Sequence, residues 1–183
     1  MAIKTFTTGE VLTASDTNTY LANSGLVFVK SQTIGSAVTS VTVSDAFSAT
    51  YDNYKIFVNS TGSSSQSLGI RIGSSTASYY GFLIYGDIGA ATVFGFASNN
   101  ATQLSNIGGC AAASQASTAS LEILNPFAAS YTKMNAGAYL DTGSFGQGTG
   151  EHRSAVSYTA FTILVGAGTI TGGTVTVYGY RKA

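Results

Sequence analysis

The sequence has few charged residues, and this shortage excludes one class of function. Charged side chains make up 9% of the 183 residues, against about a quarter in an ordinary soluble domain. The eight basic and eight acidic residues cancel and lie scattered along the chain, so no electrostatic field attracts nucleic acid. Serine, threonine, asparagine, alanine and 22 glycines stand in place of charge. This composition is typical of secreted proteins and assembled particles, and we expect no nucleic-acid partner.

Cysteine occurs once, at Cys110. A single cysteine excludes an intramolecular disulfide and a cysteine-based metal cluster. Its context, IGGCAAAS, has no neighbouring cation to activate the thiol, so we expect a buried or half-buried, unreactive side chain. The chain has no D-x-D-x-D-G calcium loop, and no helix follows the glycine-rich GSFGQGTG as a phosphate-binding loop requires. The sequence therefore predicts no cofactor and no metal ion.

Long hydrophobic runs are also missing. No run reaches the roughly 18 apolar residues of a membrane-spanning helix. The N-terminal MAIKTFTTGEV has one lysine and no apolar core, so we expect neither a secretory signal peptide nor membrane insertion. A protein made in the cytoplasm without a signal can still act outside the cell if it is released within a particle.

The chain does contain strong β-strand periodicity. In SLGIRIG, for example, Leu68, Ile70 and Ile72 share one face and Arg71 lies opposite. β-Branched and aromatic residues dominate ten segments of this kind. These segments are 25–34, 40–44, 54–59, 67–73, 79–86, 91–98, 119–125, 135–141, 157–166 and 173–182. Because no helices alternate with them, they predict an all-β sandwich or barrel of antiparallel strands.

Three segments, 59–67, 98–118 and 141–154, are predicted as loops, the first as a hairpin connection. The last is glycine-rich and contains the only local gathering of charge. We interpret Glu151, His152 and Arg153 as a solvated cluster of charge in an exposed loop, with a salt-sensitive contact to a partner as the alternative. Catalysis by the sole histidine would need an activated nucleophile and an orienting acid, and the sequence indicates neither. No pair of carboxylates has the spacing of a glycosidase, so we expect no enzyme.

The N-terminal stretch GEVLTASDTNTYLANSGL differs from the rest. Thr13 and Asp16 form an approximate capping box, which predicts a helix of about ten residues that ends at Gly25. A helix of this length is not stable alone in water. Its apolar side chains must pack on the protein's own sandwich or dock on a neighbouring subunit, and we prefer docking. The predicted docking residues are Leu12, Asp16, Tyr20 and Leu21.

Aromatic residues gather on two consecutive predicted strands. They are Tyr79, Tyr80, Phe82, Tyr85, Phe94 and Phe96. We interpret this group as core and intersubunit packing. A surface on which receptor glycans stack is the alternative, although the absence of tryptophan argues against a dedicated carbohydrate module.

Three stretches carry a resemblance to a known group of proteins. FTTGEVLTASDTNTYLANSGLVFVK resembles the N-terminal segment, of the form G-x-V-L-T-A-x-D-x-N-x-Y-L, of structural proteins of tailed bacteriophages. FSATYDNYKIFV resembles a strand-entry motif of the same group, and SYTAFTILVGAGTITGGTVTVYGYRKA resembles its C-terminal strands. The central part, 60–150, carries no such motif. The resemblance implies a virion protein with a jelly-roll sandwich, commonly a homotrimer.

Together these observations predict a jelly-roll-like antiparallel β-sandwich over residues 26–183, preceded by a docking arm with a short helix over residues 1–25. The leading functional interpretation is a non-enzymatic, surface-projecting component of a phage tail or fibre, located in the virion, with loops 59–67 and 141–154 facing the host or solvent. A capsid decoration (cement) protein is the first alternative and a glycan-binding module the second. The expected partners are further copies of the chain, a tail or major capsid protein and, in the last interpretation, a host-surface glycan.

Overall fold

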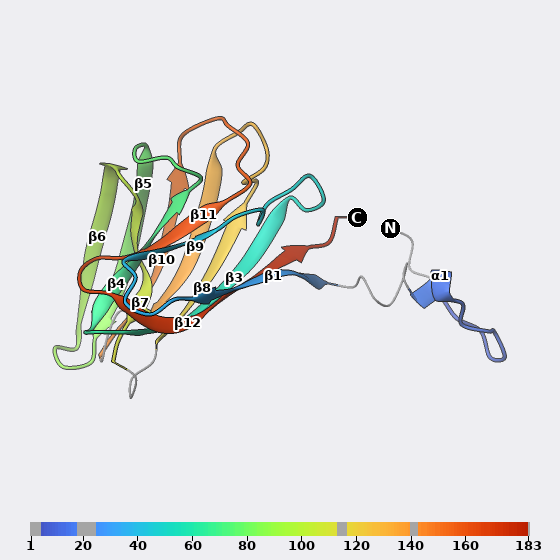
Figure 1. Ribbon diagram of the computed structural model, residues 1–183, viewed down its shortest axis with the longest axis horizontal. Helices are drawn as coiled ribbons and strands as arrows, with labels where there is room; N and C mark the ends of the chain where they lie inside the picture. The colour runs from blue at the N-terminus through green and yellow to red at the C-terminus, as the bar shows by residue number, and fades with distance from the viewer. Residues whose placement is uncertain (1–4, 18–24, 113–116, 140–142, 183) are drawn as a thin grey trace.

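The computed structural model describes residues 5–17, 25–112, 117–139 and 143–182 (Figure 1). Within these ranges the chain forms one short helical turn and twelve β-strands. The elements are α1 (Ala14–Asp16), β1 (Leu26–Ile34), β2 (Ser40–Val43), β3 (Asn53–Gly62), β4 (Gln66–Ile72), β5 (Tyr79–Asp87), β6 (Thr92–Ala101), β7 (Leu104–Cys110), β8 (Ser117–Leu124), β9 (Thr132–Tyr139), β10 (Ser144–His152), β11 (Phe161–Val165) and β12 (Ile170–Tyr180).

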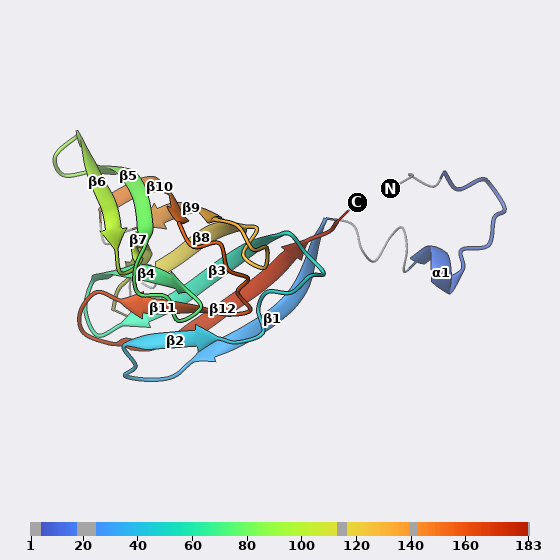
Figure 2. The ribbon, with the colours of Figure 1, turned by 90° about the horizontal axis from the view of Figure 1, so that it is seen from above.

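The strands form two antiparallel sheets that pack face to face (Figure 2). The larger sheet has eight strands in the order β1-β12-β3-β8-β9-β10-β5-β6, and the smaller has four in the order β2-β11-β4-β7. Their facing side chains form one apolar core, to which Tyr54, Ile56 and Val58 contribute from β3 and Phe161 from β11. The protein is therefore an antiparallel β-sandwich, as predicted.

Eight of the strands have the connectivity of a jelly roll. β1 pairs with β12, β2 with β11, β3 with β8 and β4 with β7. With β5, β6, β9 and β10 set aside, the first strand pairs with the last, the second with the seventh, the third with the sixth and the fourth with the fifth. This nested pairing defines a jelly roll. The predicted fold class is confirmed in its topology as well as in its layers.

The remaining four strands extend the larger sheet and are here called the wing (β9, β10, β5 and β6). The β5–β6 pair is inserted between β4 and β7, and the β9–β10 pair between β8 and β11. They add to the edge of the jelly roll in the order β8-β9-β10-β5-β6. β5 and β6 project past the four-stranded sheet (Figure 2). The larger sheet therefore has two unlike ends, with β1 at one edge and β6 at the other.

The ten predicted strands are all present. The predicted alternation holds in covered strands such as β4 and fails in β6, where no residue is buried. Leu68, Ile70 and Ile72 are fully buried, whereas Arg71 is partly exposed. One predicted connection is wrong, because the segment 59–67 is not a hairpin. It joins β3 of the larger sheet to β4 of the smaller sheet. The connection crosses between the layers, as the wrapped topology of a jelly roll requires.

Strand β7 lies within the predicted loop 98–118, so that prediction is wrong. Small residues hid the strand, because Ser, Asn and Gly give no hydrophobic alternation. The structure requires them: a Cβ at Gly108 would collide with Ala119 on the opposite sheet. Cys110 at the end of this strand is buried, as predicted, and burial raises the pKa of its thiol.

Strand β10 lies within the predicted glycine-rich loop 141–154, so that prediction is also wrong. Its glycines occur at every second position, Gly146, Gly148 and Gly150, and all three face the smaller sheet through their register with β5. A Cβ at Gly150 would lie 2.6 Å from a methyl carbon of Leu104. The glycines make room for a neighbouring side chain in a regular strand.

Candidate interaction surfaces

The described part of the N-terminal arm begins its helix as predicted. The side chain of Thr13 accepts a hydrogen bond from the backbone N–H of Asp16 at 3.1 Å, and the Asp16 carboxylate accepts one from the Thr13 N–H at 3.2 Å. This is a complete capping box. The helix α1 covers Ala14–Asp16, and its predicted continuation toward Gly25 falls largely on residues 18–24, outside the described ranges.

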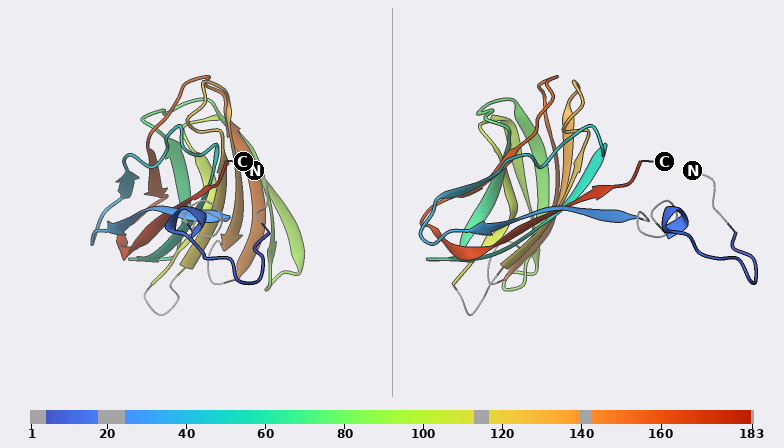
Figure 3. Two further views of the ribbon diagram at one scale, coloured as in Figure 1. Left: turned by 90° about the vertical axis from the view of Figure 1, so that its right-hand side faces the viewer. Right: turned by 45° about the vertical axis from the view of Figure 1, so that its right-hand side comes forward.

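The apolar side chains of the arm are exposed. Val11 is 79% exposed and Leu12 50%, and no residue of α1 is buried. Figure 3 shows the α1 turn apart from the sandwich. The first of the two predicted alternatives, packing on the protein's own sandwich, is therefore not seen for residues 5–17. Of the predicted docking residues, Leu12 and Asp16 lie at this turn, whereas Tyr20 and Leu21 lie outside the described residues.

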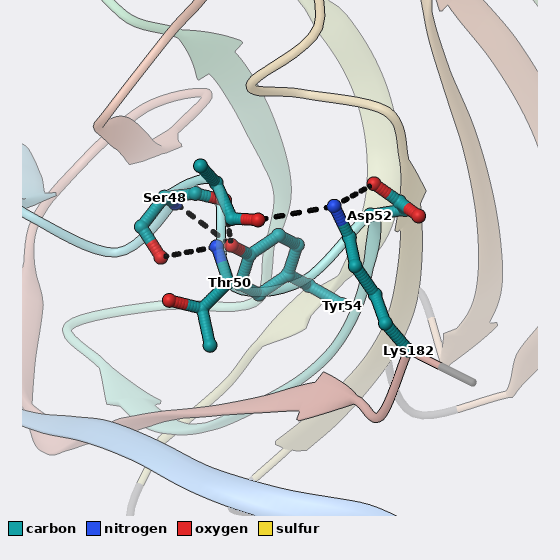
Figure 4. Close-up of polar contacts among 6 residues, drawn as sticks. Ser48, Thr50, Asp52, Tyr54 and Lys182 are labelled. Atoms are coloured by element: carbon teal, nitrogen blue, oxygen red, sulfur yellow. Dashed lines mark hydrogen bonds and ion pairs between the residues drawn. The ribbon is translucent and has the colours of Figure 1, made fainter. Parts of the chain in front are cut away.

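The chain leaves the arm and enters the sandwich beside its own C-terminal strand. Leu26, the first residue of β1, pairs with Tyr180 of β12, and the N–H of Arg181 donates to the Gly25 carbonyl at 3.2 Å. The next residue, Lys182, donates to the Ala49 carbonyl at 3.0 Å (Figure 4). These bonds fix the point from which the arm departs.

The loop whose carbonyl accepts the Lys182 hydrogen bond is also hydrogen-bonded to a buried tyrosine. Lys182 also forms an ion pair with Asp52 at 2.6 Å (Figure 4). The hydroxyl of the fully buried Tyr54 accepts a hydrogen bond from the Ser48 N–H at 2.8 Å and donates one to the Ser48 carbonyl at 3.1 Å. The loop is thus bonded on both sides, next to the point where β1 begins.

His152 does not lie in an exposed loop, which corrects the prediction for this residue. It is the last residue of β10 and is fully buried. Its ring stacks on Tyr79 with the centroids 4.5 Å apart and lies 5.4 Å from the ring of Tyr158. Its Nε2 shares a hydrogen bond of 2.8 Å with the Ser75 hydroxyl. Burial lowers the pKa of the imidazole, which favours its neutral form.

The His152–Ser75 contact lacks the other parts of a nucleophilic pair. The Ser75 hydroxyl donates to the Ala77 carbonyl at 3.2 Å, so its proton is already engaged in a hydrogen bond within the loop. After burial, the next influence on the pKa of His152 is the Ala77 backbone and not a carboxylate. The pair therefore fastens the loop between β4 and β5, and the expectation that the protein is not an enzyme remains a prediction.

Glu151 and Arg153 face away from His152, on the outer side of the wing. The Glu151 carboxylate accepts hydrogen bonds from Lys133 at 2.7 Å and from Arg153 at 2.6 Å, and these bonds lower its pKa. The Arg153 guanidinium lies 4.1 Å from the ring centre of Tyr80. Strand alternation separates the three residues that were predicted to form one contact loop. Only two of them remain available to a partner.

The aromatic group of β5 and β6 is divided between core and surface. Tyr79 is fully buried, which agrees with the core interpretation. The three phenylalanines Phe82, Phe94 and Phe96 are exposed by 40–49%. Phe82 lines two adjoining hollows of about 400 and 440 Å³ on the outer face of the wing, together with Asn135 and Thr149. The wing thus presents both apolar and amide side chains to solvent.

Among the described residues, no group of three or more His, Cys, Asp or Glu side chains is placed to hold a metal ion. No helix of that part of the chain is long and apolar enough to cross a membrane. No model of a known protein family matches this chain, and no curated protein matches it in sequence.

Proposed function

We propose that this protein is a structural component of a tailed-bacteriophage virion, in which the N-terminal arm docks on a neighbouring virion protein and the jelly roll projects outward. The observation that carries the proposal is the exposure of the arm, in which Val11 and Leu12 directly precede a helix start that is already capped. The resemblance of this segment to phage structural proteins supplies the identity of the particle.

The energetics of the arm support docking. A capped but very short helix does not hold its conformation alone in water, and each apolar side chain that a partner covers fully contributes about 1.5–3 kcal/mol. In an oligomer of this chain, two or more arms would bind together, and linkage would raise the avidity well above the affinity of one arm. Weak single contacts would then give stable attachment.

Our leading assignment is a surface-projecting tail or fibre component. It is favoured by the hollows on the outer face of the wing, which Tyr80, Phe82 and Asn135 help to line. The arm enters the larger sheet at β1, and the free end of the wing lies at the opposite edge of the same sheet. A protein held by its arm would therefore keep this surface free for the host. A capsid decoration protein would use the same arm on a different partner.

A binding experiment with separated phage heads and tails tests both assignments. The purified full-length chain is added to each fraction from particles that lack it, and bound protein is measured after sedimentation. We expect saturable binding to tails that Leu12→Asp weakens at least about tenfold. Val156→Asp is the matched control, because Val156 is also 50% exposed but lies in a loop far along the chain.

The outcomes separate the alternatives. Binding to heads that depends on Leu12 would favour the decoration role and exclude the tail assignment. Binding that Leu12→Asp and Val156→Asp leave equally strong would overturn docking through the arm. Immunogold labelling of intact virions provides an independent readout, since label over the tail or over the head shows where the protein resides.

A further inference from the structure

We infer that two copies of this chain associate through the open edge of β6, with the β6 strands antiparallel across a two-fold axis, so that the larger sheet continues from one copy into the other. The partner is a second copy of the chain, and the surface is the free end of the wing. The inference depends on the wing alone and stands whether or not the virion role is correct.

The first observation is that β6 is an unguarded sheet edge. It is ten residues long, contains neither a charged residue nor proline, and pairs on one side only, with β5. A β-bulge opposite Tyr79 and Gly81 disturbs its last residues and leaves 92–98 regular. Long, flat, uncharged edges readily pair with another chain, and soluble proteins usually protect them.

The other three sheet edges are protected. β1 carries Lys30 and a bulge between Phe28 and Lys30. β2 is only four residues long, and most of β7 is buried. No second open edge therefore exists among the described strands for β6 to meet in a head-to-tail contact. Its complement is another β6, and a contact between identical surfaces is a closed two-fold contact.

The second observation is the set of apolar side chains that β6 itself exposes. Val93 is 73% exposed, Phe94 40% and Phe96 43%. Val93 lies on one face of the strand and the two phenylalanines on the other, so both faces of the edge offer apolar contacts to a paired strand. Such cross-strand contacts add to the main-chain hydrogen bonds of a paired edge.

The two faces of β6 fit the proposed pairing. Phe94 and Phe96 register with Tyr85 and Leu83 on the face toward the smaller sheet, whereas Val93 lies on the outer face. A two-fold axis near Gly95 places Phe94 opposite the partner's Phe96, and aromatic pairs across strands stabilise sheets. Gly95 lies against the ring of Phe82 and carries no side chain of its own, so the centre of the β6 edge has little bulk.

Sedimentation velocity of the purified full-length chain over micromolar to submillimolar concentrations tests the inference. We expect a concentration-dependent species of twice the monomer mass. Val93→Lys places a charge at the edge and should weaken dimerisation at least about tenfold. Val156→Lys introduces the same change at an exposed loop valine and should leave it unchanged. Circular dichroism confirms that both variants remain folded.

Hydrogen exchange of the wild-type chain gives a readout that needs no variant. Amides within 92–98 should gain protection as concentration rises, while those of β1 at the other edge should not. A monomer at all concentrations, a trimer without a dimer, or a dimer whose β6 amides stay unprotected would overturn the inference.

Discussion

Strands β3 and β6 are both ten residues long, yet five residues of β3 are buried and none of β6 is. Both belong to the same sheet and both contain aromatic and aliphatic side chains. The difference is the layer above them: β3 lies beneath the four-stranded sheet, and β6 lies beyond its last strand, β7. Coverage by a second layer, and not the strand's own composition, decides which side chains form the core.

The side chains on the inner face of the larger sheet become smaller from the jelly roll toward β10 of the wing. In the jelly roll it carries large side chains such as Tyr54 and Ile56, and in β10 it carries Gly146, Gly148 and Gly150. Leu104 of β7 lies in the space beside Gly150. The wing is also joined to the jelly roll by the β8–β9 pairing and by buried side chains of β5 and β9 that belong to the common core.

A matched pair of phenylalanine truncations should show the largest contrast. Phe161 is fully buried and stacks on Phe47 with the centroids 5.5 Å apart, so Phe161→Ala should lower the free energy of unfolding by about 3–5 kcal/mol. Phe96 on the wing is 43% exposed, so Phe96→Ala should cost less than about 1 kcal/mol. Urea unfolding at submicromolar protein concentration, where self-association is minimal, measures both. Equal losses would mean that the wing has a core of its own.

The junction should be weaker than the core but stronger than the wing surface. Leu104→Ala removes the side chain that lies over Gly81 and Gly150, and it should cost about 2–4 kcal/mol. Because the loss occurs between the two regions, hydrogen exchange should accelerate first in β5 and β6 and only later in β3. Uniform acceleration across the larger sheet would contradict this division. Val165→Ala, on β11 of the jelly roll, is a control that should leave β5 and β6 unaffected.

Two tyrosine hydroxyls allow the same comparison at the level of single hydrogen bonds. The Tyr54 hydroxyl holds the loop at Ser48 beside the jelly roll. The Tyr79 hydroxyl accepts from the Ile72 N–H at 2.7 Å and donates to the Ser75 carbonyl at 3.2 Å at the start of the wing. Each Tyr→Phe change leaves a backbone donor unpaired and should cost about 1–3 kcal/mol.

Tyr79→Phe should be the more costly of the two, because the Ile72 N–H is buried whereas that of Ser48 is only partly so. Thermal unfolding of both variants measures the two losses. Tyr178→Phe is the control, because the Tyr178 hydroxyl forms no hydrogen bond with the described residues, and its loss gives the cost of removing a hydroxyl alone. A larger loss for Tyr54→Phe would reverse the inferred order of burial.

Sequence reasoning identified the strands in which apolar residues alternate, such as 67–73, because burial of one face leaves that signature. It failed at β7 and β10, where the inner positions are Gly108 or Gly146 and tight packing replaces hydrophobicity. A signal was present in β10, since its glycines recur at every second residue, the period of a strand. Hydropathy alone gives such residues no weight.

The candidate surfaces were less predictable for a different reason. Phe94 and Phe96 alternate as core residues do, and only the absence of a covering strand exposes them. His152 was assigned to the surface with its charged neighbours Glu151 and Arg153, although alternation along a strand places it on the opposite face. The exposure of Phe94 and Phe96 depends on the order of strands in the sheets, which is a property of the whole chain. The burial of His152 depends on the strand that the glycine-rich segment forms, which hydropathy did not indicate.

The smallest expected effect is a pH dependence that originates at the end of β10. Burial lowers the pKa of His152 below its ordinary value of 6.5, so the folded state binds fewer protons than the unfolded state around that pH. Stability should be complete above pH 6.5 and decline as the pH falls. The rings against His152 belong to Tyr79 and Tyr158. Burial raises the pKa of Tyr79 to about 12, so its hydroxyl stays neutral in this range.

His152 is the only histidine, so between pH 6.5 and the range in which carboxylates titrate, near 4.5, the slope should come from this residue. Chemical unfolding at several pH values in that window measures it. His152→Phe keeps a ring against Tyr79 and should flatten the profile, even if loss of the Ser75 hydrogen bond lowers stability at every pH. A slope that survives this substitution would place the titrating group elsewhere. A slope that disappears would show that the buried ring joining the wing to the loop after β4 is held in its neutral form.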